Sequence, residues 1–274
     1  EWSVNEKTAM EVAAGAAYAG ARAMVTTSGG GFALMTEGIS LAGMIESPLV
    51  VHVAQRPGPA TGLPTRTEQA DLDLVLYAGH GEFPRIILAP GNLSEAFYVA
   101  QKAFQLADEY QVPVFVLTDQ FLVDTYYNVP RFALDRVSIK PQIVETTQDY
   151  RRYVLAPDGI SPRGIPGYGT GLVGVDSDEH DEAGHLTEDL ELRVRMQQKR
   201  MRKLEAIRKA ADRPKLMGNE DYQTLVVGWG SSMEVIKEAL AEIDRPELAG
   251  LHFTWVYPPA PEAIHYLRQA ERII

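Results

Sequence analysis

A β-rich apolar run at residues 48–55 constrains the fold more than any other feature of the sequence. It lacks the alternation of apolar and polar residues that marks a strand with one exposed face, so it is typical of a buried parallel strand. Neighbouring segments alternate between strand and helix patterns: the predicted strands are residues 23–27, 48–55, 85–89 and 112–118, and the predicted helices residues 8–21, 32–44 and 92–110. Strands separated by helices predict a parallel α/β sheet with helices on both faces.

The α/β pattern stops near residue 130 and returns near residue 221. The segment 129–174 is interrupted by proline and glycine, which predicts irregular chain. The second pattern comprises strands at 224–229 and 251–257, helices at 233–243 and 261–270, and the start of a strand at 272–274. We therefore predict an α/β domain at 1–130, an irregular linker with a charged helix at 131–220, and a truncated α/β domain at 221–274.

A reversal of charge lies within the predicted linker. Residues 176–191 hold eight acids and no Lys or Arg, and residues 193–209 hold eight bases and one acid on a helical background. Two interpretations are open: a helix whose basic face meets an acidic surface, or a linker helix surrounded by solvent. We favour the solvated linker helix.

Composition excludes several classes of protein. With 26 Lys and Arg against 37 Asp and Glu, the formal charge of -11 argues against a general nucleic-acid binder and a polybasic membrane-surface protein. The sequence has no cysteine, so these residues form no disulfide, thiol nucleophile, zinc–thiolate site or iron–sulfur ligand. Any iron–sulfur cluster must come from a partner.

The two ends and the apolar runs predict a cytoplasmic part of a longer polypeptide. No run reaches the roughly 20 apolar residues of a membrane-spanning helix, and residues 1–6 are polar and acidic where a signal peptide is basic. The chain does not begin with Met, and it stops at what is expected to be the start of a strand.

Two glycine-containing segments are candidates for ligand binding. Residues 26–32 run from a strand through a glycine turn into a helix, which can present backbone N–H groups to an anion, although a tight turn without a ligand is equally compatible. The loop at 56–69 follows the carboxyl end of a strand, where open α/β sheets bind ligands. In this loop Arg66, beside Thr65, could grip a carboxylate or instead form a surface pair with Glu68 or Asp71.

Other ionisable residues have simpler interpretations. From its position alone, Glu6 is a favourable charge at a helix N-terminus. His52 lies in an apolar strand and is expected to be a hydrogen-bonded core histidine, whereas His80 lies in a glycine loop and could line a cleft. Residues 178–185 carry acids and histidines without a metal-binding spacing, so we predict no metal site. The motif of a serine hydrolase is absent from the sequence.

Taken together, these segments resemble the α subunit of 2-oxoacid:ferredoxin oxidoreductases, in the branch that includes 2-oxoglutarate synthase. The resemblance covers nearly the whole chain, and the loop at 58–69 is its most specific part. The matching segments are GAAYAGARA at 15–23, TSGGGFALM at 27–35, GPATGLPTRTEQ at 58–69, EHDEAGH at 179–185 and VVGWGS at 226–231. The family's α subunit begins earlier, with a substrate- and cofactor-contacting segment that these residues do not include.

The resemblance implies a pyrimidine-binding domain of a thiamine-diphosphate enzyme, followed by a transketolase-C-terminal-like domain. It implies oxidative decarboxylation of a 2-oxoacid to an acyl-coenzyme A, with electrons passing to ferredoxin. Glu6 would be the catalytic carboxylate that hydrogen-bonds the cofactor's aminopyrimidine, Ser28 and Gly29 would shape the wall beside it, and Arg66 with Thr65 would orient the substrate carboxylate. A β subunit would hold the diphosphate, Mg²⁺ and a [4Fe–4S] cluster, in a dimer of αβ heterodimers.

Three alternatives remain open on the sequence. The enzyme could prefer pyruvate, branched-chain or a broad range of 2-oxoacids rather than 2-oxoglutarate, because one arginine does not separate these substrates. The chain could be a catalytically silent scaffold or regulatory subunit, against which the presence of both Glu6 and Arg66 argues. A free-standing nucleotide-binding domain rests on the glycine turns alone.

Overall fold

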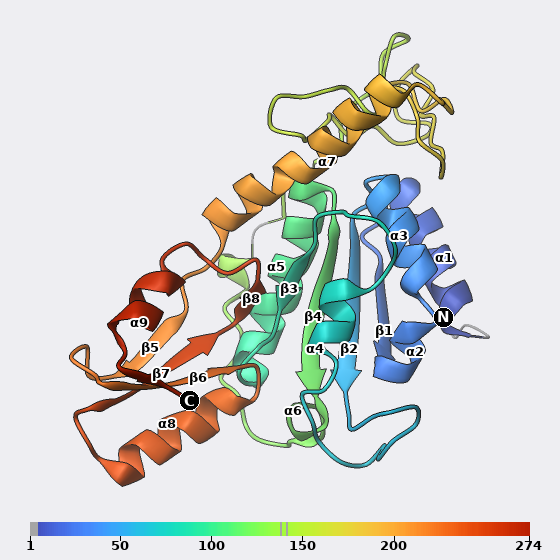
Figure 1. Cartoon of the computed structure of the whole chain (residues 1–274). Helices are drawn as coiled ribbons and strands as arrows, with labels where there is room; N and C mark the ends of the chain where they lie inside the picture. The colour runs from blue at the N-terminus through green and yellow to red at the C-terminus, as the bar shows by residue number, and fades with distance from the viewer. Residues whose placement is uncertain (1–4, 138, 141) are drawn as a thin grey trace.

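The computed structural model describes residues 5–137, 139–140 and 142–274. Among these residues the strands form two sheets, arranged side by side in Figure 1. The first has the order β1-β2-β4-β3-β8 and the second the order β5-β7-β6-β9. No helix in the described part of the chain is long and apolar enough to cross a membrane.

The first sheet confirms the predicted parallel arrangement, with an antiparallel strand added at one edge. Its strands are β1 (Met24–Ser28), β2 (Leu49–Gln55), β3 (Ile86–Leu88), β4 (Pro113–Asp119) and β8 (Trp255–Tyr257). β1, β2, β4 and β3 pair in parallel, and β8 runs antiparallel to β3. The helices before and between these strands are α1 (Glu6–Tyr18), α2 (Gly29–Ala33), α3 (Thr36–Met44), α4 (Leu72–Tyr77) and α5 (Leu93–Tyr110).

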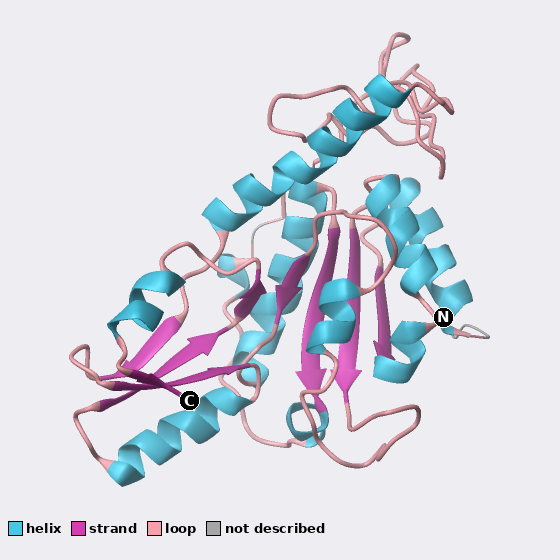
Figure 2. Cartoon of the chain, in the orientation of Figure 1, coloured by secondary structure: helices cyan, strands magenta, loops and turns pink. Residues whose placement is uncertain are grey.

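Helices cover both faces of this sheet, as Figure 2 shows. Val51 and Val53 of β2 face one apolar cluster, which includes Met10 of α1 and Ile39 of α3. Val50 faces the opposite cluster, which includes residues of α5. Because successive side chains of a strand point to opposite faces, burial on both sides explains why β2 is apolar without alternation.

The second sheet is smaller and mixed. It contains β5 (Lys215–Gly218), β6 (Thr224–Trp229), β7 (Leu248–Phe253) and β9 (Arg272–Ile273), with α8 (Ser232–Ile243) and α9 (Ala263–Gln269) between strands. β6 pairs in parallel with β7 and β9, and β5 runs antiparallel to β7. The strand expected at 272–274 is therefore present at the edge of the sheet.

Two expected elements differ from the structure. The helix expected at 32–44 is two helices, α2 and α3, separated by a turn at 34–35. The strand expected at 251–257 divides at Thr254, so that β7 joins the second sheet and β8 the first. The chain passes from the second sheet to the first at Thr254, whose carbonyl accepts a hydrogen bond from Ala89 N at 2.8 Å. This run is apolar because it pairs with two different sheets.

The pairing of β5 and β8 crosses the boundaries of the predicted domains. β5 lies in the predicted linker but pairs within the second sheet, and β8 lies in the predicted second domain but pairs within the first. The division at 1–130, 131–220 and 221–274 stays a prediction. Between α6 (Gln120–Asp124) and α7 (Leu190–Ala210), the described chain is irregular, as expected, with a short 3-10 helix at Leu134–Arg136 and isolated β-bridges.

The solvated-linker interpretation of the basic helix is wrong for one face of α7. Lys199, Arg200 and Lys203 on that face are at most 2% exposed. Both lysines form ion pairs with the buried Glu46, and Arg200 pairs with Glu179. The helix packs diagonally across the edge where the strands of the first sheet begin (Figure 1), and Glu46 comes just before β2. The alternative interpretation, a basic face against acidic groups, is confirmed.

Electrostatics explains how three cations share the neighbourhood of one buried carboxylate. Burial alone would raise the pKa of Glu46, but the charges of Lys203, Lys199 and Arg152 outweigh it and hold that pKa well below its usual range. Burial lowers the pKa of Lys203 to about 8, although Glu46 opposes the shift. This cluster fastens α7 to the turn before β2.

Candidate active site at the strand ends

Glu6 lies beside the glycine turn that follows the carboxyl end of β1. Glu6 is the first residue of α1, whose N-cap Asn5 accepts a hydrogen bond from Thr8 N at 2.9 Å. The Glu6 side chain lies directly against Gly31 of α2: a β-carbon on Gly31 would come within 2.7 Å of Glu6 Cγ and 2.8 Å of Glu6 Oε1, and it would overlap Thr27 Oγ1. Glycine at position 31 thus leaves the room that the carboxylate occupies.

A second carboxylate lies against the start of the same helix. A β-carbon on Gly29 would overlap both oxygens of Asp71, so this glycine also makes room for an acid. Burial raises the pKa of Asp71, while the charge of Arg56 opposes the shift. Asp71 is held at the end of the loop because its backbone N–H donates to Gln55 Oε1 at 3.0 Å.

Within the described part of the chain, three polar groups around this turn have no hydrogen-bond partner. Asp71 Oδ2 and Arg56 Nε are buried and unpaired within the described residues. In residues 5–137, 139–140 and 142–274 the Glu6 carboxylate has neither a hydrogen bond nor an ion pair. Buried polar groups are normally paired, so unpaired ones at a strand end indicate a place for a polar ligand.

The loop that bears Arg66 is exposed. Arg66 Nη1 donates to the carbonyl of Thr65 at 3.1 Å, and in the part of the chain that the structure describes Arg66 pairs with neither Glu68 nor Asp71. The structure therefore brings Glu6, Ser28 and Gly29 to the same strand end, whereas Thr65 and Arg66 lie on the exposed loop beyond it. The role of Arg66 in binding a carboxylate stays a prediction.

The family follows from a match that covers most of the chain. Residues 3–199 match the family model described as pyruvate flavodoxin/ferredoxin oxidoreductase, thiamine diphosphate-binding. The chain belongs to this family. Its mixed, mostly parallel α/β fold is that of the family's thiamine-diphosphate-binding domain, as the sequence predicted.

Several named members of the pyruvate flavodoxin/ferredoxin oxidoreductase family are similar to this chain. It is 43% identical to the α subunit of 2-oxoacid:ferredoxin oxidoreductase 1 from Sulfurisphaera tokodaii, over 87% of this chain and 39% of that protein. It is 31% identical to the 2-oxoglutarate synthase subunit KorA from Archaeoglobus fulgidus, over 98% of this chain and 72% of that protein. The chain thus spans about two fifths of the length of the first of these relatives.

A solved structure of the family shares nearly the whole fold. The 2-oxoglutarate:ferredoxin oxidoreductase from Magnetococcus marinus, with 2-oxoglutarate, coenzyme A and succinyl-CoA bound, superposes with a TM-score of 0.93 at 30% identity. The match covers 99% of this chain and 48% of that chain. Both sheets described above therefore belong to the part that the two proteins share.

The residues at the strand end fit the cofactor of the family's thiamine-diphosphate-binding domain. The aminopyrimidine of thiamine diphosphate offers ring nitrogens and an amino group, which need an acid and other polar partners. Counting contacts among the described residues, Glu6 supplies a carboxylate without a partner, and Asp71 and Arg56 each supply a buried atom without a hydrogen bond. Glycines 29 and 31 keep side chains away from the first turn of α2.

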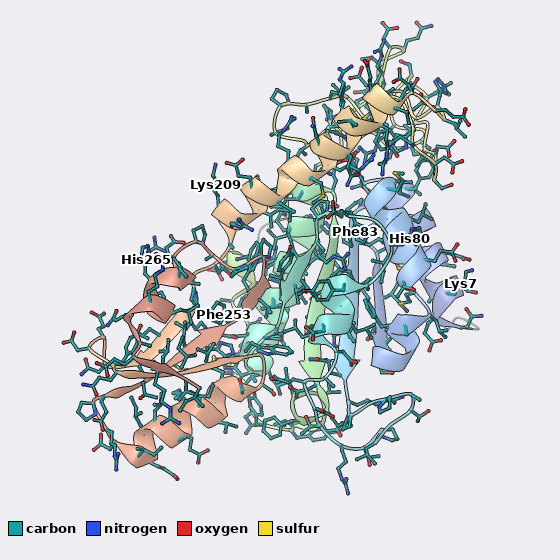
Figure 3. All side chains as sticks on the ribbon, viewed as in Figure 1. Lys7, His80, Phe83, Lys209, Phe253 and His265 are labelled. Atoms are coloured by element: carbon teal, nitrogen blue, oxygen red, sulfur yellow. The ribbon has the colours of Figure 1, made fainter. Side chains whose placement is uncertain are left out.

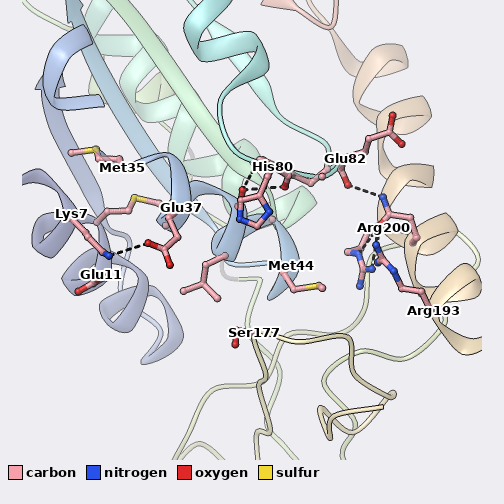
Figure 4. Close-up of a pocket in the computed structure, with 18 residues that line it drawn as sticks. Lys7, Glu11, Met35, Glu37, Met44, His80, Glu82, Ser177, Arg193 and Arg200 are labelled. Carbon is pink, nitrogen blue, oxygen red and sulfur yellow. Dashed lines mark hydrogen bonds and ion pairs between the residues drawn. The ribbon is translucent and has the colours of Figure 1, made fainter. Parts of the chain in front are cut away.

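A well-formed pocket among the described residues lies elsewhere. It has a volume of about 450 Å³ and opens between α1, α3, the loop at 80–83 and α7, as Figure 4 shows. His80 lines it, which confirms the expectation that this histidine borders a cleft. Neither Glu6 nor the loop at 56–69 is part of its lining. We assign the candidate site to the strand ends because the Glu6 carboxylate and the unpaired buried atoms of Arg56 and Asp71 gather there around the glycine turn.

The other histidine prediction is also confirmed. His52 Nδ1 lies 2.6 Å from Thr26 Oγ1 and His52 Nε2 lies 2.8 Å from Thr118 Oγ1, so neighbouring strands satisfy both ring nitrogens. Burial lowers the pKa of His52, which favours the neutral ring.

For the acidic segment, no group of three or more His, Cys, Asp or Glu among the described residues is arranged to hold a metal ion.

Sequence reasoning missed Arg56 and Asp71 as site residues. Arg56 directly follows the last residue of β2, and Asp71 immediately precedes α4. One signal was available, since both residues flank the loop at the carboxyl end of a buried parallel strand. Their close approach depends on how the loop closes on itself, which no local pattern encodes.

Proposed function

We propose that this chain is the part of a 2-oxoacid:ferredoxin oxidoreductase α subunit that contributes Glu6 to a thiamine-diphosphate site. The observation that carries the proposal is the position of Glu6 in a chain of this family: its carboxylate lies against Gly31 and has no partner among the described residues. The chemistry that thiamine diphosphate supplies when bound is cleavage of the carbon–carbon bond next to a 2-oxo group.

Each residue of the candidate site then has a defined task. Glu6, the first residue of α1, would hold the aminopyrimidine by a hydrogen bond at a ring nitrogen. Ser28 and Gly29 form the wall beside that ring. Arg66, with Thr65, orients the carboxylate of the substrate from the exposed loop, and Arg56 is a second guanidinium at the base of the same loop.

The substrate class follows from the relatives. The relative at 43% identity is named a 2-oxoacid:ferredoxin oxidoreductase, and the solved structure at 30% identity contains 2-oxoglutarate and coenzyme A. We assign oxidative decarboxylation of 2-oxoglutarate, or of a similar 2-oxoacid, with coenzyme A as acyl acceptor. The broader 2-oxoacid range remains the second candidate because the more similar relatives carry that name.

The remaining parts of the reaction belong to partners in this proposal. These residues contain no cysteine, so a β subunit supplies the [4Fe–4S] cluster together with the sites for the diphosphate and Mg²⁺. Electrons pass on to ferredoxin, and the assembly is a dimer of αβ heterodimers in the cytoplasm. The name α subunit, which the relatives carry, supports the need for a partner subunit.

An anaerobic assay of the complex purified through this chain tests the proposal. The complex is supplied with thiamine diphosphate, Mg²⁺, coenzyme A and a viologen dye, and 2-oxoglutarate, pyruvate and 2-oxoisovalerate are compared. We expect dye reduction with a preference for 2-oxoglutarate. Equal reduction with all three substrates would assign the broad 2-oxoacid activity. No reduction by a complex that contains the cluster-bearing subunit would contradict the proposal and favour a silent scaffold.

A further inference from the structure

The loop at 56–71 is fastened at its base and along its second half. At the base, the buried Gln55 accepts from Asp71 N at 3.0 Å and donates through Nε2 to the Thr118 carbonyl at 3.2 Å. Further along, Thr67 Oγ1 accepts from Phe121 N at 3.1 Å. Most residues between 58 and 68 are exposed, so these contacts hold the position of the loop.

The second sheet contributes a further contact to this loop. Gln69 Nε2 donates to the Trp229 carbonyl at 2.9 Å and to Asp119 Oδ2 at 3.3 Å. Ser231 Oγ donates to the same Asp119 oxygen. Asp119 ends β4 of the first sheet, whereas Trp229 and Ser231 flank the turn after β6 of the second sheet. One loop residue and one buried carboxylate therefore connect the two sheets.

The geometry of this junction depends on an acid and a glycine. Asp119 is 2% exposed, and its other oxygen, Oδ1, accepts from Leu122 N at 3.0 Å, so both oxygens have partners. Gly230 has a φ of 59°, a left-handed conformation that L side chains rarely adopt. A β-carbon at that position would come within 3.0 Å of Gln69 Nε2. The turn can approach the loop this closely because residue 230 is glycine.

We infer that Gln69, Asp119 and Ser231 are positioning residues through which the second sheet sets the conformation of the loop that carries Thr65, Arg66 and Asp71. We call the hydrogen-bonded group of Gln69, Asp119 and Ser231 the brace. The inference rests on the proposed function, because it assigns the brace a consequence for substrate binding. Gln69 is three residues from Arg66 and two from Asp71 in the same loop. Releasing it would loosen the carboxyl half of the loop, and with it the backbone position from which Arg66 would reach a substrate carboxylate.

Substrate kinetics of the complex test the inference. Ser231→Ala and Gln69→Leu should each raise KM for the preferred 2-oxoacid by about threefold to tenfold, the effect of losing one net hydrogen bond, with kcat nearly unchanged. Ser231→Thr keeps the hydroxyl and should retain the original KM. Glu234→Ala is the matched control, because it removes another contact between the two sheet units, from Asn92 Nδ2 to Glu234 Oε1 at 3.0 Å, without touching the loop.

Hydrogen–deuterium exchange gives a readout that does not depend on activity. The amide of Arg66 donates to the Leu63 carbonyl within the loop, and that of Asp71 donates to the Gln55 side chain at the end of β2. Both amides should exchange faster in Ser231→Ala and Gln69→Leu than in the unchanged complex or in Glu234→Ala. Unchanged KM and unchanged exchange in both variants would overturn the inference. If the unchanged complex converts no 2-oxoacid, the proposed function fails, and the exchange rates alone still support or overturn the brace.

Discussion

Lys203 and Glu46, which are far apart in the sequence, meet in the interior: Lys203 Nζ lies 2.5 Å from Glu46 Oε2, and the two side chains are 1% and 2% exposed. Lys199, one helical turn earlier, reaches the other oxygen of the same carboxylate at 2.5 Å. The helix that contains both lysines also closes one side of the pocket in Figure 4, and Figure 3 shows how its side chains project from the ribbon. Burying such a cluster is costly unless every charge is paired, so its integrity should control stability.

The first prediction concerns this carboxylate. Glu46→Gln removes the shared negative charge and leaves two buried lysines uncompensated, so we expect a loss of about 3–5 kcal/mol in the free energy of unfolding. Denaturant titration of the purified protein measures it. Glu205→Gln is the control, because Glu205 and Lys209 form a pair in which both side chains are 71% exposed. That substitution should cost about 0.5 kcal/mol or less, and equal losses in both variants would contradict the assignment.

Acid should weaken the same cluster. The pKa of Glu46 in the folded chain is depressed below its ordinary value of 4.5, so the unfolded state binds more protons than the folded state once the pH falls near 4.5. The stability from Glu46 is fully present above that pH and is lost as the pH falls toward the folded pKa. Unfolding free energies measured between neutral pH and the acid range should fall less steeply in Glu46→Gln. Parallel curves for the two proteins would exclude this source of acid sensitivity.

Removal of the Glu6 carboxylate should abolish turnover. Glu6→Ala lacks the group proposed to act on the aminopyrimidine, and a loss of at least about 100-fold in kcat is expected for the removal of an acid–base group. Assembly with the β subunit, measured by size-exclusion chromatography, should be nearly unchanged. Glu11→Gln, an exposed acid on the same helix, should keep its activity. Near-normal turnover by Glu6→Ala would remove Glu6 from the reaction.

Arg66 should act mainly on substrate binding. Arg66→Met loses the proposed contact with the substrate carboxylate, and KM should rise by a factor that corresponds to about 2–4 kcal/mol for a desolvated ion pair. Steady-state kinetics with the preferred 2-oxoacid separates KM from kcat. Arg245→Met, at a side chain that is 68% exposed near the second sheet, serves as the control. An unchanged KM in Arg66→Met would indicate that this arginine is a surface residue, and Arg56 would be the next position to change.

Substitution by alanine should lower the activity at Gly31 and raise the stability at Gly15. Gly31→Ala places a β-carbon against Glu6 and Thr27, so activity should fall because the carboxylate must move. Gly15, inside α1, has no atom within 4 Å of an added β-carbon. Gly15→Ala should therefore stabilise the isolated protein by about 0.5–1 kcal/mol, the helix preference for alanine. Thermal unfolding and the dye assay on both variants test the pair, and a Gly31→Ala enzyme with full activity would contradict the geometry.

Local patterns in the sequence determined the four parallel strands of the first sheet and pointed to the strand ends as the place of the candidate site. The apolar run of β2 predicted a strand buried on both faces, and residues 58–69 with the glycine turn pointed to the family. These features are readable because strand burial, helix starts and glycine turns each depend on neighbouring residues. Glu6 was ambiguous at that level, since a first-turn acid is ordinary in any helix.

The tertiary structure alone decided which distant groups meet. The basic residues of α7 were compatible with a solvated helix, and the packing of that helix against Glu46 makes part of them buried ion-pair partners. The strand at 255–257 joins the first sheet, and Gln69 meets Asp119 and the turn after β6, because the chain returns to these places after long separations. A sequence pattern fixes what each segment can bury. Which partner it is buried against depends on the free energy of the whole packed arrangement.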